Sequence, residues 1–246
     1  MKTVMQNAKR INLFQFFVLL LAFGMFSACN KEEEQVTTVS EEDAVEVIEN
    51  ALVVESEGLT AEIEDAAQVA DEYAEKAEVP CGETFDSTVV YTLANSYITA
   101  NYTSDWAWTL SCNQQNIPTT LDFTRTTDGE YETTRMLSDD SATGVWTMDN
   151  LLLGDAYIIN GSYSRTGNQE SKVRNMPTFT STVEFDLTDV NVDKDLYRIS
   201  SGTATFTISG TGSGGRNFQY TGEIIFLGDG AATITINDNT YSVDLY

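Results

Sequence analysis

The 246-residue chain contains no histidine. Histidine is the side chain whose unperturbed pKa lies closest to neutral pH, so enzymes and metal sites use it often. Its absence excludes histidine-based catalytic triads, histidine-ligated zinc and histidine general bases. We therefore predict a protein that is not an enzyme and that holds no cofactor.

Basic residues are scarce as well: 13 Lys and Arg stand against 38 Asp and Glu, giving a formal net charge of −25. A field of this sign repels phosphate backbones, so nucleic acid is excluded as a partner. The same field favours cationic partners, divalent metal ions among them.

Long apolar runs are missing too. The apolar run Ile11–Phe26 has 16 residues, fewer than the about 20 that a membrane-spanning helix needs. Three basic residues and no acidic one precede it, and it leads into Phe26-Ser27-Ala28-Cys29. A basic section, a short apolar section and small residues, in this order, are typical of a secretory signal peptide.

The cysteine at the cleavage point makes this stretch resemble a bacterial lipoprotein lipobox, with Phe26 where Leu is commoner. The resemblance implies that residues 1–28 are a lipoprotein signal peptide and that Cys29 becomes the lipidated first residue, anchored in outer-membrane lipid. The alternative is an ordinary signal peptide followed by a chance cysteine. Removing residues 1–28 would change the formal charge to −28, because that segment carries three bases and no acid.

Residues 29–40 have no apolar periodicity, which predicts a flexible, lipidated tether. Within the tether, Lys31, Glu32, Glu33 and Glu34 resemble the Lys-acid-acid export signal of Bacteroidota lipoproteins. That resemblance implies an outer-membrane protein exposed on the cell surface. The alternative is a solvated run of charges with no further role.

Residues 41–79 are expected to form a short, acidic α-helical segment. Ser40 before three acids is a favourable helix start, and Gly58 is expected to end this first helix. Thr60 is expected to cap a second helix that stops at Pro80. Each apolar stripe is narrow and rich in alanine, so we expect the pair to pack along one side only.

Residues 80–246 are expected to form an all-β domain. The apolar period changes to two after Cys81, and turn residues recur between the alternating segments. This pattern predicts an antiparallel meander of about ten strands that curls into a sandwich or an open barrel. Cys81 and Cys112 are the two cysteines left after Cys29, and in an oxidising compartment they are expected to form a disulfide.

Several features of this domain follow one another in a distinctive order along the chain. They are the two cysteines, Met148-Asp149-Asn150 followed by Gly161-Ser162-Tyr163, Ser201-Gly202-Thr203-Ala204, and a terminal hairpin that starts at Gly228-Asp229-Gly230. In this order they resemble a group of all-β surface lipoproteins of Bacteroidota. The chain departs from the group at Ala231, where others carry a cysteine. The resemblance implies no activity that could be carried over.

Three local patterns of polar residues are candidate sites. The first has the spacing of oxygen ligands at the start of a calcium loop, and its residues are Asp189, Asn191, Asp193 and Asp195. Calcium loops flanked by helices also need Gly and Glu at two later positions, where this chain has Lys194 and Ser200. The alternative interpretation is a bulge or a turn. In the second, Ser87 and Ser141 each follow an Asp in a motif that resembles the O-glycosylation acceptors of Bacteroidota. The alternative is that both are ordinary Asp-Ser turns. In the third, Glu130 and Glu132 share a strand face and are a candidate for the two carboxylates of a hydrolase. The alternative is chance, because a chain with 38 acids contains many such pairs.

Trp106 and Trp108 lie on the same strand face as Leu110 and Cys112, which favours core packing over a platform for sugars. Tyr97, Tyr131, Tyr157 and Trp146 are further candidates for an exposed aromatic patch.

Three functions remain open at this point. The first is a lipid-anchored surface module that binds an unidentified glycan or protein ligand without catalysis. The second is an envelope accessory or structural lipoprotein whose acidic helical segment docks a membrane-protein partner. The third is a hydrolase that uses two carboxylates.

Overall fold

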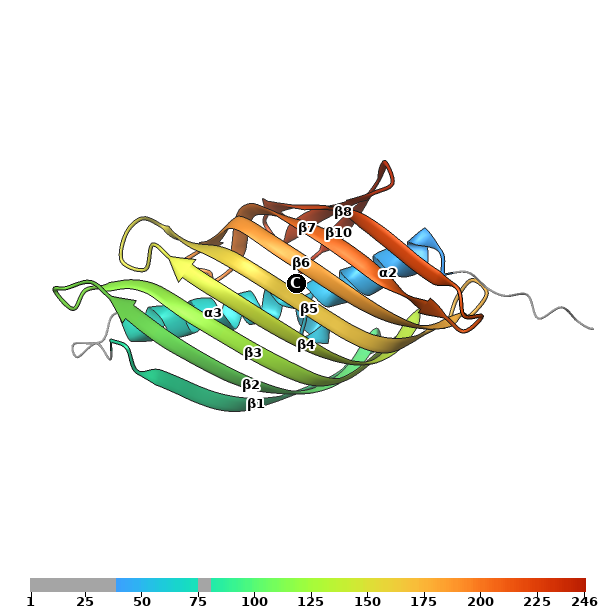
Figure 1. The fold of residues 1–246 in the computed structure, drawn as a ribbon, viewed down its shortest axis with the longest axis horizontal. Helices are drawn as coiled ribbons and strands as arrows, with labels where there is room; N and C mark the ends of the chain where they lie inside the picture. The colour runs from blue at the N-terminus through green and yellow to red at the C-terminus, as the bar shows by residue number, and fades with distance from the viewer. Residues whose placement is uncertain (1–38, 75–80) are drawn as a thin grey trace, which may run out of the picture. The chain divides into compact units, whose positions relative to one another are not determined.

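The computed structural model of the protein describes residues 39–74 and 81–246, which belong to one compact unit. Within these residues, two α-helices and a short 3-10 helix precede ten strands (Figure 1). The helices are α2 (Glu41–Leu52), η1 (Val54–Ser56) and α3 (Leu59–Ala74). The strands are β1 (Thr84–Ala94), β2 (Ile98–Cys112), β3 (Pro118–Thr133), β4 (Met136–Asp149), β5 (Ala156–Ser171), β6 (Thr178–Asp193), β7 (Ile199–Gly212), β8 (Asn217–Gly228), β9 (Ala231–Ile236) and β10 (Asn239–Asp244).

All ten strands belong to one sheet, in the order in which they occur along the chain. Each pairs antiparallel with its sequence neighbour, so the sheet is a meander with β1 and β10 at its two edges. The prediction of a mainly β fold, a ten-stranded meander and a preceding helical segment is confirmed. Of the two expected outcomes, the sandwich is not formed, because there is no second sheet among the described residues. The single sheet stays open.

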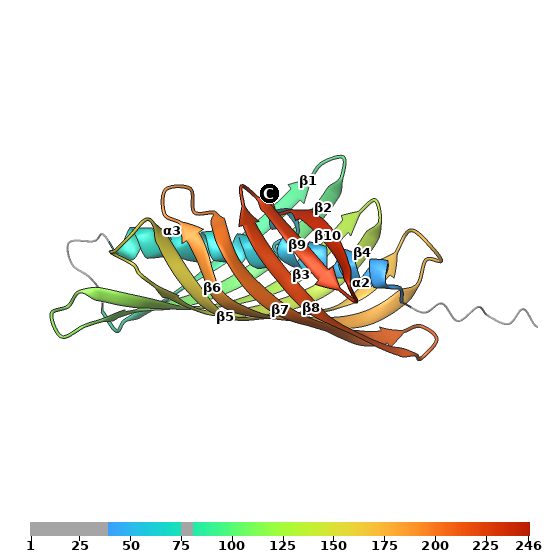
Figure 2. The same ribbon diagram turned by 90° about the horizontal axis from the view of Figure 1, so that it is seen from above.

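The helices lie along one face of this sheet, which curves around them (Figure 2). We call this the inner face and the opposite one the outer face. Helix α3 contacts β3, β6 and β7, and α2 contacts β6. Nine of the twelve residues of α2 are buried, charged ones included. The expectation that the helices pack along one side only is therefore wrong for α2, because the curved sheet reaches around its polar flanks, whereas α3 keeps a stripe with Gln68 and Glu72 exposed.

The start of α2 follows the sequence prediction. Ser40 and Asp43 form a capping box, in which the Ser40 hydroxyl accepts a hydrogen bond from the Asp43 backbone N–H at 3.1 Å. Gly58 is needed where the chain turns into α3, because a Cβ there would come within 2.7 Å of the Ala51 carbonyl oxygen. The predicted cap at Thr60 is wrong: α3 begins at Leu59, and the buried Thr60 hydroxyl has no hydrogen-bond partner among the described residues.

The inner face of the sheet forms the core with the helices. Its side chains are mainly aromatic and aliphatic, and they include Trp108, which is buried. The half-buried Trp106 packs against Phe123 with 5.9 Å between ring centroids. Core packing of this tryptophan pair is thus confirmed. The expected aromatic patch is wrong for Tyr131, Tyr157 and Trp146, which are buried, while Tyr97 is 78% exposed.

The two cysteines meet at the end of the sheet where β1 begins and β2 ends. The Cys81 and Cys112 Cα atoms lie 5.6 Å apart and the two sulfurs are joined, across 31 residues of chain. The bond ties the segment that enters β1 to the neighbouring strand. In the chain-entropy description, such a loop contributes about 3–4 kcal/mol to stability.

Candidate functional site

The outer face of the sheet consists mostly of exposed threonine, serine, asparagine and acidic side chains. The strand registers align these side chains into rows that run across the sheet. One row passes from Asn101 through Glu130, Asp139, Asn168 and Thr180 to Thr211, each residue directly opposite the next. A long polar row of this kind offers hydrogen-bonding groups at the spacing of neighbouring strands, about 4.8 Å.

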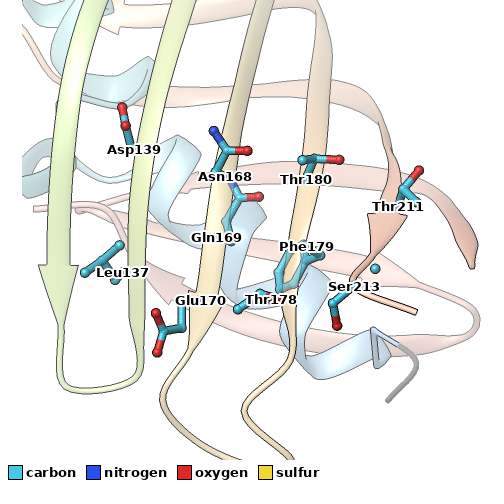
Figure 3. A pocket seen from close by; sticks show the side chains of 11 residues that line it. Leu137, Asp139, Asn168, Gln169, Glu170, Thr178, Phe179, Thr180, Thr211 and Ser213 are labelled. Atoms are coloured by element: carbon cyan, nitrogen blue, oxygen red, sulfur yellow. The ribbon is translucent and has the colours of Figure 1, made fainter. Parts of the chain in front are cut away.

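A shallow hollow lies on this row, over β4 to β7 (Figure 3). It has a volume of about 500 Å³. Asp139, Asn168, Thr180 and Thr211 lie side by side along it in Figure 3. We call it the outer hollow; its exposed lining side chains are Leu137, Asp139, Asn168, Glu170, Thr178, Thr180, Thr211 and Ser213. A second hollow of about 340 Å³ adjoins it at Asp139 and extends to β1.

Glu130 and Asp139 are directly opposite each other on β3 and β4 and both face solvent. Like charges at directly opposite positions of a sheet are destabilising, by a few tenths to about 1 kcal/mol. No ion pair is formed by either residue within the described part of the chain. On the same face of β3, Glu132 does have a partner, because its carboxylate accepts from the Lys172 ammonium at 2.6 Å.

Among the described residues, the acids of the outer face lack arginine partners because the buried arginines lie on the inner face and point toward the helices. Arg125 is buried on the inner face, where it donates to Glu57, to Asp65 at 2.7 Å and to Ser104 at 2.9 Å. Arg125 forms ion pairs with acids of the helical segment. It therefore does not neutralise the acids of the outer face.

Arg165 is the second buried arginine of the inner face. Its guanidinium pairs with Asp140 at 2.9 Å and donates to the Asn50 carbonyl oxygen at 2.9 Å and to the Tyr102 hydroxyl. These contacts join β5, β4 and β2 to the end of α2. Burial raises the pKa of the Tyr102 hydroxyl well above its usual range, so this hydroxyl stays protonated and donates to Asp140 at 3.2 Å.

Two further arginines contact α2 from the turns between β3 and β4 and between β5 and β6. Arg174 donates to Asp43 at 2.6 Å, and Arg135 donates to Glu46 at 3.1 Å. Asp43 and Glu46 are themselves buried. The sheet and its turns therefore supply arginines from one side to four acids of the helical segment, which are Asp43, Glu46, Glu57 and Asp65.

Glu62 differs from these paired acids. It is 0% exposed, and neither of its carboxyl oxygens has a hydrogen-bond partner among the described residues. It lies against β4, because a Cβ added at Gly144 would meet the Glu62 carboxyl oxygen. Burial raises the pKa of Glu62 to about 8, against a smaller opposing effect of Arg125. Glu62 is therefore mostly protonated at neutral pH.

Sequence reasoning missed Arg125, Arg165 and Glu62. A signal existed for the arginines, since each falls at an inward position of an alternating strand, beside Phe123 or Tyr163. A charge at such a position requires a buried partner. No comparable signal marks Glu62, which stands on an acidic helix close to Glu64 and Asp65.

The calcium candidates do not come together. The Asp193 carboxylate accepts from the backbone N–H groups of Asp195 and Leu196, at 2.9 and 2.8 Å, and so closes a turn. Asp189 lies at an interruption of the β6–β7 register, as the alternative of a bulge predicts, and the Asn191 side chain donates to its backbone carbonyl. Within residues 39–74 and 81–246, no group of three potential metal ligands is assembled.

The remaining candidates are spread over the molecule. Ser87 is a half-buried residue of β1 that faces inward, and Ser141 is an exposed residue of β4, so both lie within strands instead of turns. Glu130 and Glu132 are exposed on β3. Cys29 and the tether residues Lys31 to Glu34 lie outside the described residues.

Comparison with protein-family models, curated proteins and solved structures finds no match to this chain. Among the described helices, none has both the length and the apolar character required to cross a membrane.

Proposed function

We propose that the protein is a lipid-anchored binding module that is displayed on the cell surface and that engages a cationic ligand through its outer face. The anchor rests on the signal peptide of residues 1–28 and on Cys29, and surface display rests on the tether signal Lys31 to Glu34. The observation that carries the binding role is the distribution of charge between the two faces. Arg125, Arg135 and Arg174 pair with acids of the helical segment, while Glu130 and Asp139 face each other beside the outer hollow with no ion pair among the described residues.

A cationic ligand would relieve the repulsion between these two carboxylates. The neighbouring amides and hydroxyls of the row, such as Asn168 and Thr180, add hydrogen-bonding partners for a polar ligand. A glycan that stacks on aromatic rings is supported less well, because the tryptophans lie on the inner face and Tyr97 stands apart from the hollow. Of the two ligand classes left open by the sequence, a protein segment rich in Lys or Arg fits this surface better.

The two alternatives receive less support. Nine of the twelve residues of α2 are buried against the sheet, which leaves little of its acidic surface free to dock a membrane protein. A carboxylate hydrolase needs a cleft that holds two close carboxylates, one of them with a raised pKa. The carboxyls whose pKa burial raises all belong to the helical segment, and they are Glu49, Glu57, Glu62, Glu64 and Asp65.

Binding of a lysine decapeptide to the whole mature protein tests the proposal. The helices supply a large part of the core, so isolated residues 80–246 are not a suitable sample. The double variant Glu130→Gln/Asp139→Asn should weaken binding by about tenfold, and raising the salt concentration should weaken it in the wild type. The matched control is Glu184→Gln/Asp186→Asn, which removes the same charge from the outer face of β6.

The control double variant should change the affinity by no more than about twofold, because its carboxylates lie farther from the outer hollow. If both double variants weakened binding equally, attraction would follow net charge alone and the hollow would not be a site. If a glycan bound and the decapeptide did not, the proposed ligand class would be wrong.

A further inference from the structure

The free edge of β1 is a second surface of the molecule with unused bonding capacity. β1 is eleven residues long and pairs along its whole length with β2 alone. It is the first strand in the sheet order, and no other described segment forms backbone hydrogen bonds with residues Thr84 to Ala94. About every second residue of an edge strand points its N–H and C=O outward, so β1 offers a long unpaired backbone ladder.

The opposite edge of the sheet is protected. β10 has only six residues, and the chain just beyond it is covered, because the Val54 N–H donates to the Leu245 carbonyl oxygen at 3.1 Å. The core side chains there, Val243 and Leu245, are buried. The two edges therefore differ, and only that of β1 is both long and uncovered within the described residues.

The side chains of β1 indicate that the core is incomplete at this edge. None of its eleven residues is buried. Its inward side chains include Phe85 and Tyr91, which are half-buried, and Val89, which is 37% exposed. On the adjacent β2, the inward residues Tyr102 and Leu110 are buried. One more strand beside β1 would cover its inward side chains in the way that β1 covers those of β2.

Natural proteins protect such edges with lysine, proline, bulges or a covering segment. β1 has none of the first three: its sequence contains no Lys or Pro, and its register with β2 runs without interruption from Thr84 to Ala94. Asp86 is its one charged residue, in a chain with a formal charge of −25. Val90 is 71% exposed on its outer side. A strand this neutral and apolar is unusual on this surface.

We propose that β1 is a docking edge that accepts an extended segment of a partner protein as an additional strand, and that this segment is neutral or basic. Main-chain hydrogen bonds to the free edge would supply affinity, and alternate side chains would cover Val89 and Tyr91. The second hollow supports the basic character, because it begins at Val90 and Thr92 of β1 and holds Asp128, Glu130 and Asp139.

Charge argues against a second copy of this chain at the edge. Two copies would bring together two bodies of the same strongly negative charge, and acidic residues lie beside the edge at Glu83, Asp86 and Asp105. The tether is no better suited, since Lys31 is followed by three glutamates. The backbone edge of β1 is a different surface from the outer hollow, although Glu130 and Asp139 lie between the two, so the test below measures the β1 amides directly and thereby distinguishes the two proposals.

The test uses the whole mature protein and two synthetic peptides of eleven residues. The first alternates valine and threonine and carries a lysine at each end, and the second has the same charge but proline at alternate positions, so that it cannot form a strand. Hydrogen exchange of the β1 amides is measured with and without each peptide. The strand-forming peptide should slow exchange at about every second β1 amide by tenfold or more, and the proline peptide should leave exchange unchanged.

The matched variants are Val89→Lys, at the inward side of the edge, and Val145→Lys, at an exposed outer position of β4. Both add one positive charge. Val89→Lys should weaken binding of the strand-forming peptide by about tenfold, because it places an inward charge beside the added strand, and Val145→Lys should have less than a twofold effect. Circular dichroism checks that both variants fold, and the proline peptide remains a control that needs no variant.

Four results would overturn the proposal. The first is equal binding of the two peptides, which would mean charge attraction without strand addition. The second is protection of amides elsewhere with none at β1. The third is protection of β1 that rises with protein concentration in the absence of peptide, which would assign the edge to a second copy of the chain. The fourth is peptide binding that leaves the β1 amides of the wild type unprotected and that is lost in Glu130→Gln/Asp139→Asn. This result would place the peptide at the outer hollow.

Discussion

Replacing Glu62 with glutamine should stabilise the protein at neutral pH. The buried carboxyl has no hydrogen-bond partner among the described residues, and burial raises its pKa to about 8 from 4.5. Between these two pH values the folded protein holds a proton on Glu62 that the unfolded chain releases. The stability that wild type has below pH 4.5 is therefore lost progressively as the pH rises toward 8.

The size of the effect follows from the two pKa values. A tenfold change in proton affinity corresponds to about 1.4 kcal/mol, so protonating Glu62 on folding costs about 3 kcal/mol at pH 7 and about 5 kcal/mol above pH 8. Glutamine has the shape of the protonated acid and does not titrate. The free energy of unfolding of Glu62→Gln minus that of wild type should thus rise by roughly 3 kcal/mol between pH 5 and pH 8.

Urea unfolding followed by tryptophan fluorescence at pH 5, 6, 7 and 8 measures this difference. Glu57 and Asp65 also have raised pKa values through burial, but they are present in both proteins and largely cancel. The control is Glu42→Gln, which removes an exposed carboxylate from α2 and should change stability by a few tenths of a kcal/mol, because only the helix dipole is affected. Parallel curves for wild type and Glu62→Gln from pH 5 to 8 would refute the reasoning.

Four other outcomes can be checked directly. Cys29→Ala should block lipidation and leave the protein uncleaved or mislocalised, and a variant still recovered as a mature membrane protein would contradict the lipid anchor. Replacing residues 31–34 with alanine should keep lipidation but protect the protein from protease added to intact cells; equal digestion of wild type and variant would argue against a surface address. Reduction of the disulfide should lower the melting temperature without unfolding the chain, by an amount that reflects about 3–4 kcal/mol. Arg165→Met should cost about 3–5 kcal/mol in urea unfolding, because Asp140 is left buried and unpaired, and adding Asp140→Asn should restore part of that loss.

The sequence alone was sufficient for the local features of the fold. Alternation of period two marks the strands, turn residues separate them, and the absence of helical segments between them implies a meander. The start of α2 could be predicted because the Ser40–Asp43 capping box depends on residues three apart. The cysteine pair could be predicted from its even number. All of these signals lie within a few residues of the element that they describe, or in the composition itself.

Only the tertiary structure decided where the acids of the helical segment go. Their periodicity indicates an exposed acidic face, but the sheet brings Arg125 to Asp65 across 60 positions of sequence and Arg165 to the end of α2 across 115. A buried charge depends on the presence of such a distant partner, which no local pattern specifies. The outer hollow and the free edge of β1 have the same origin, since cross-strand register and the curvature that leaves the sheet open are set by the whole sheet.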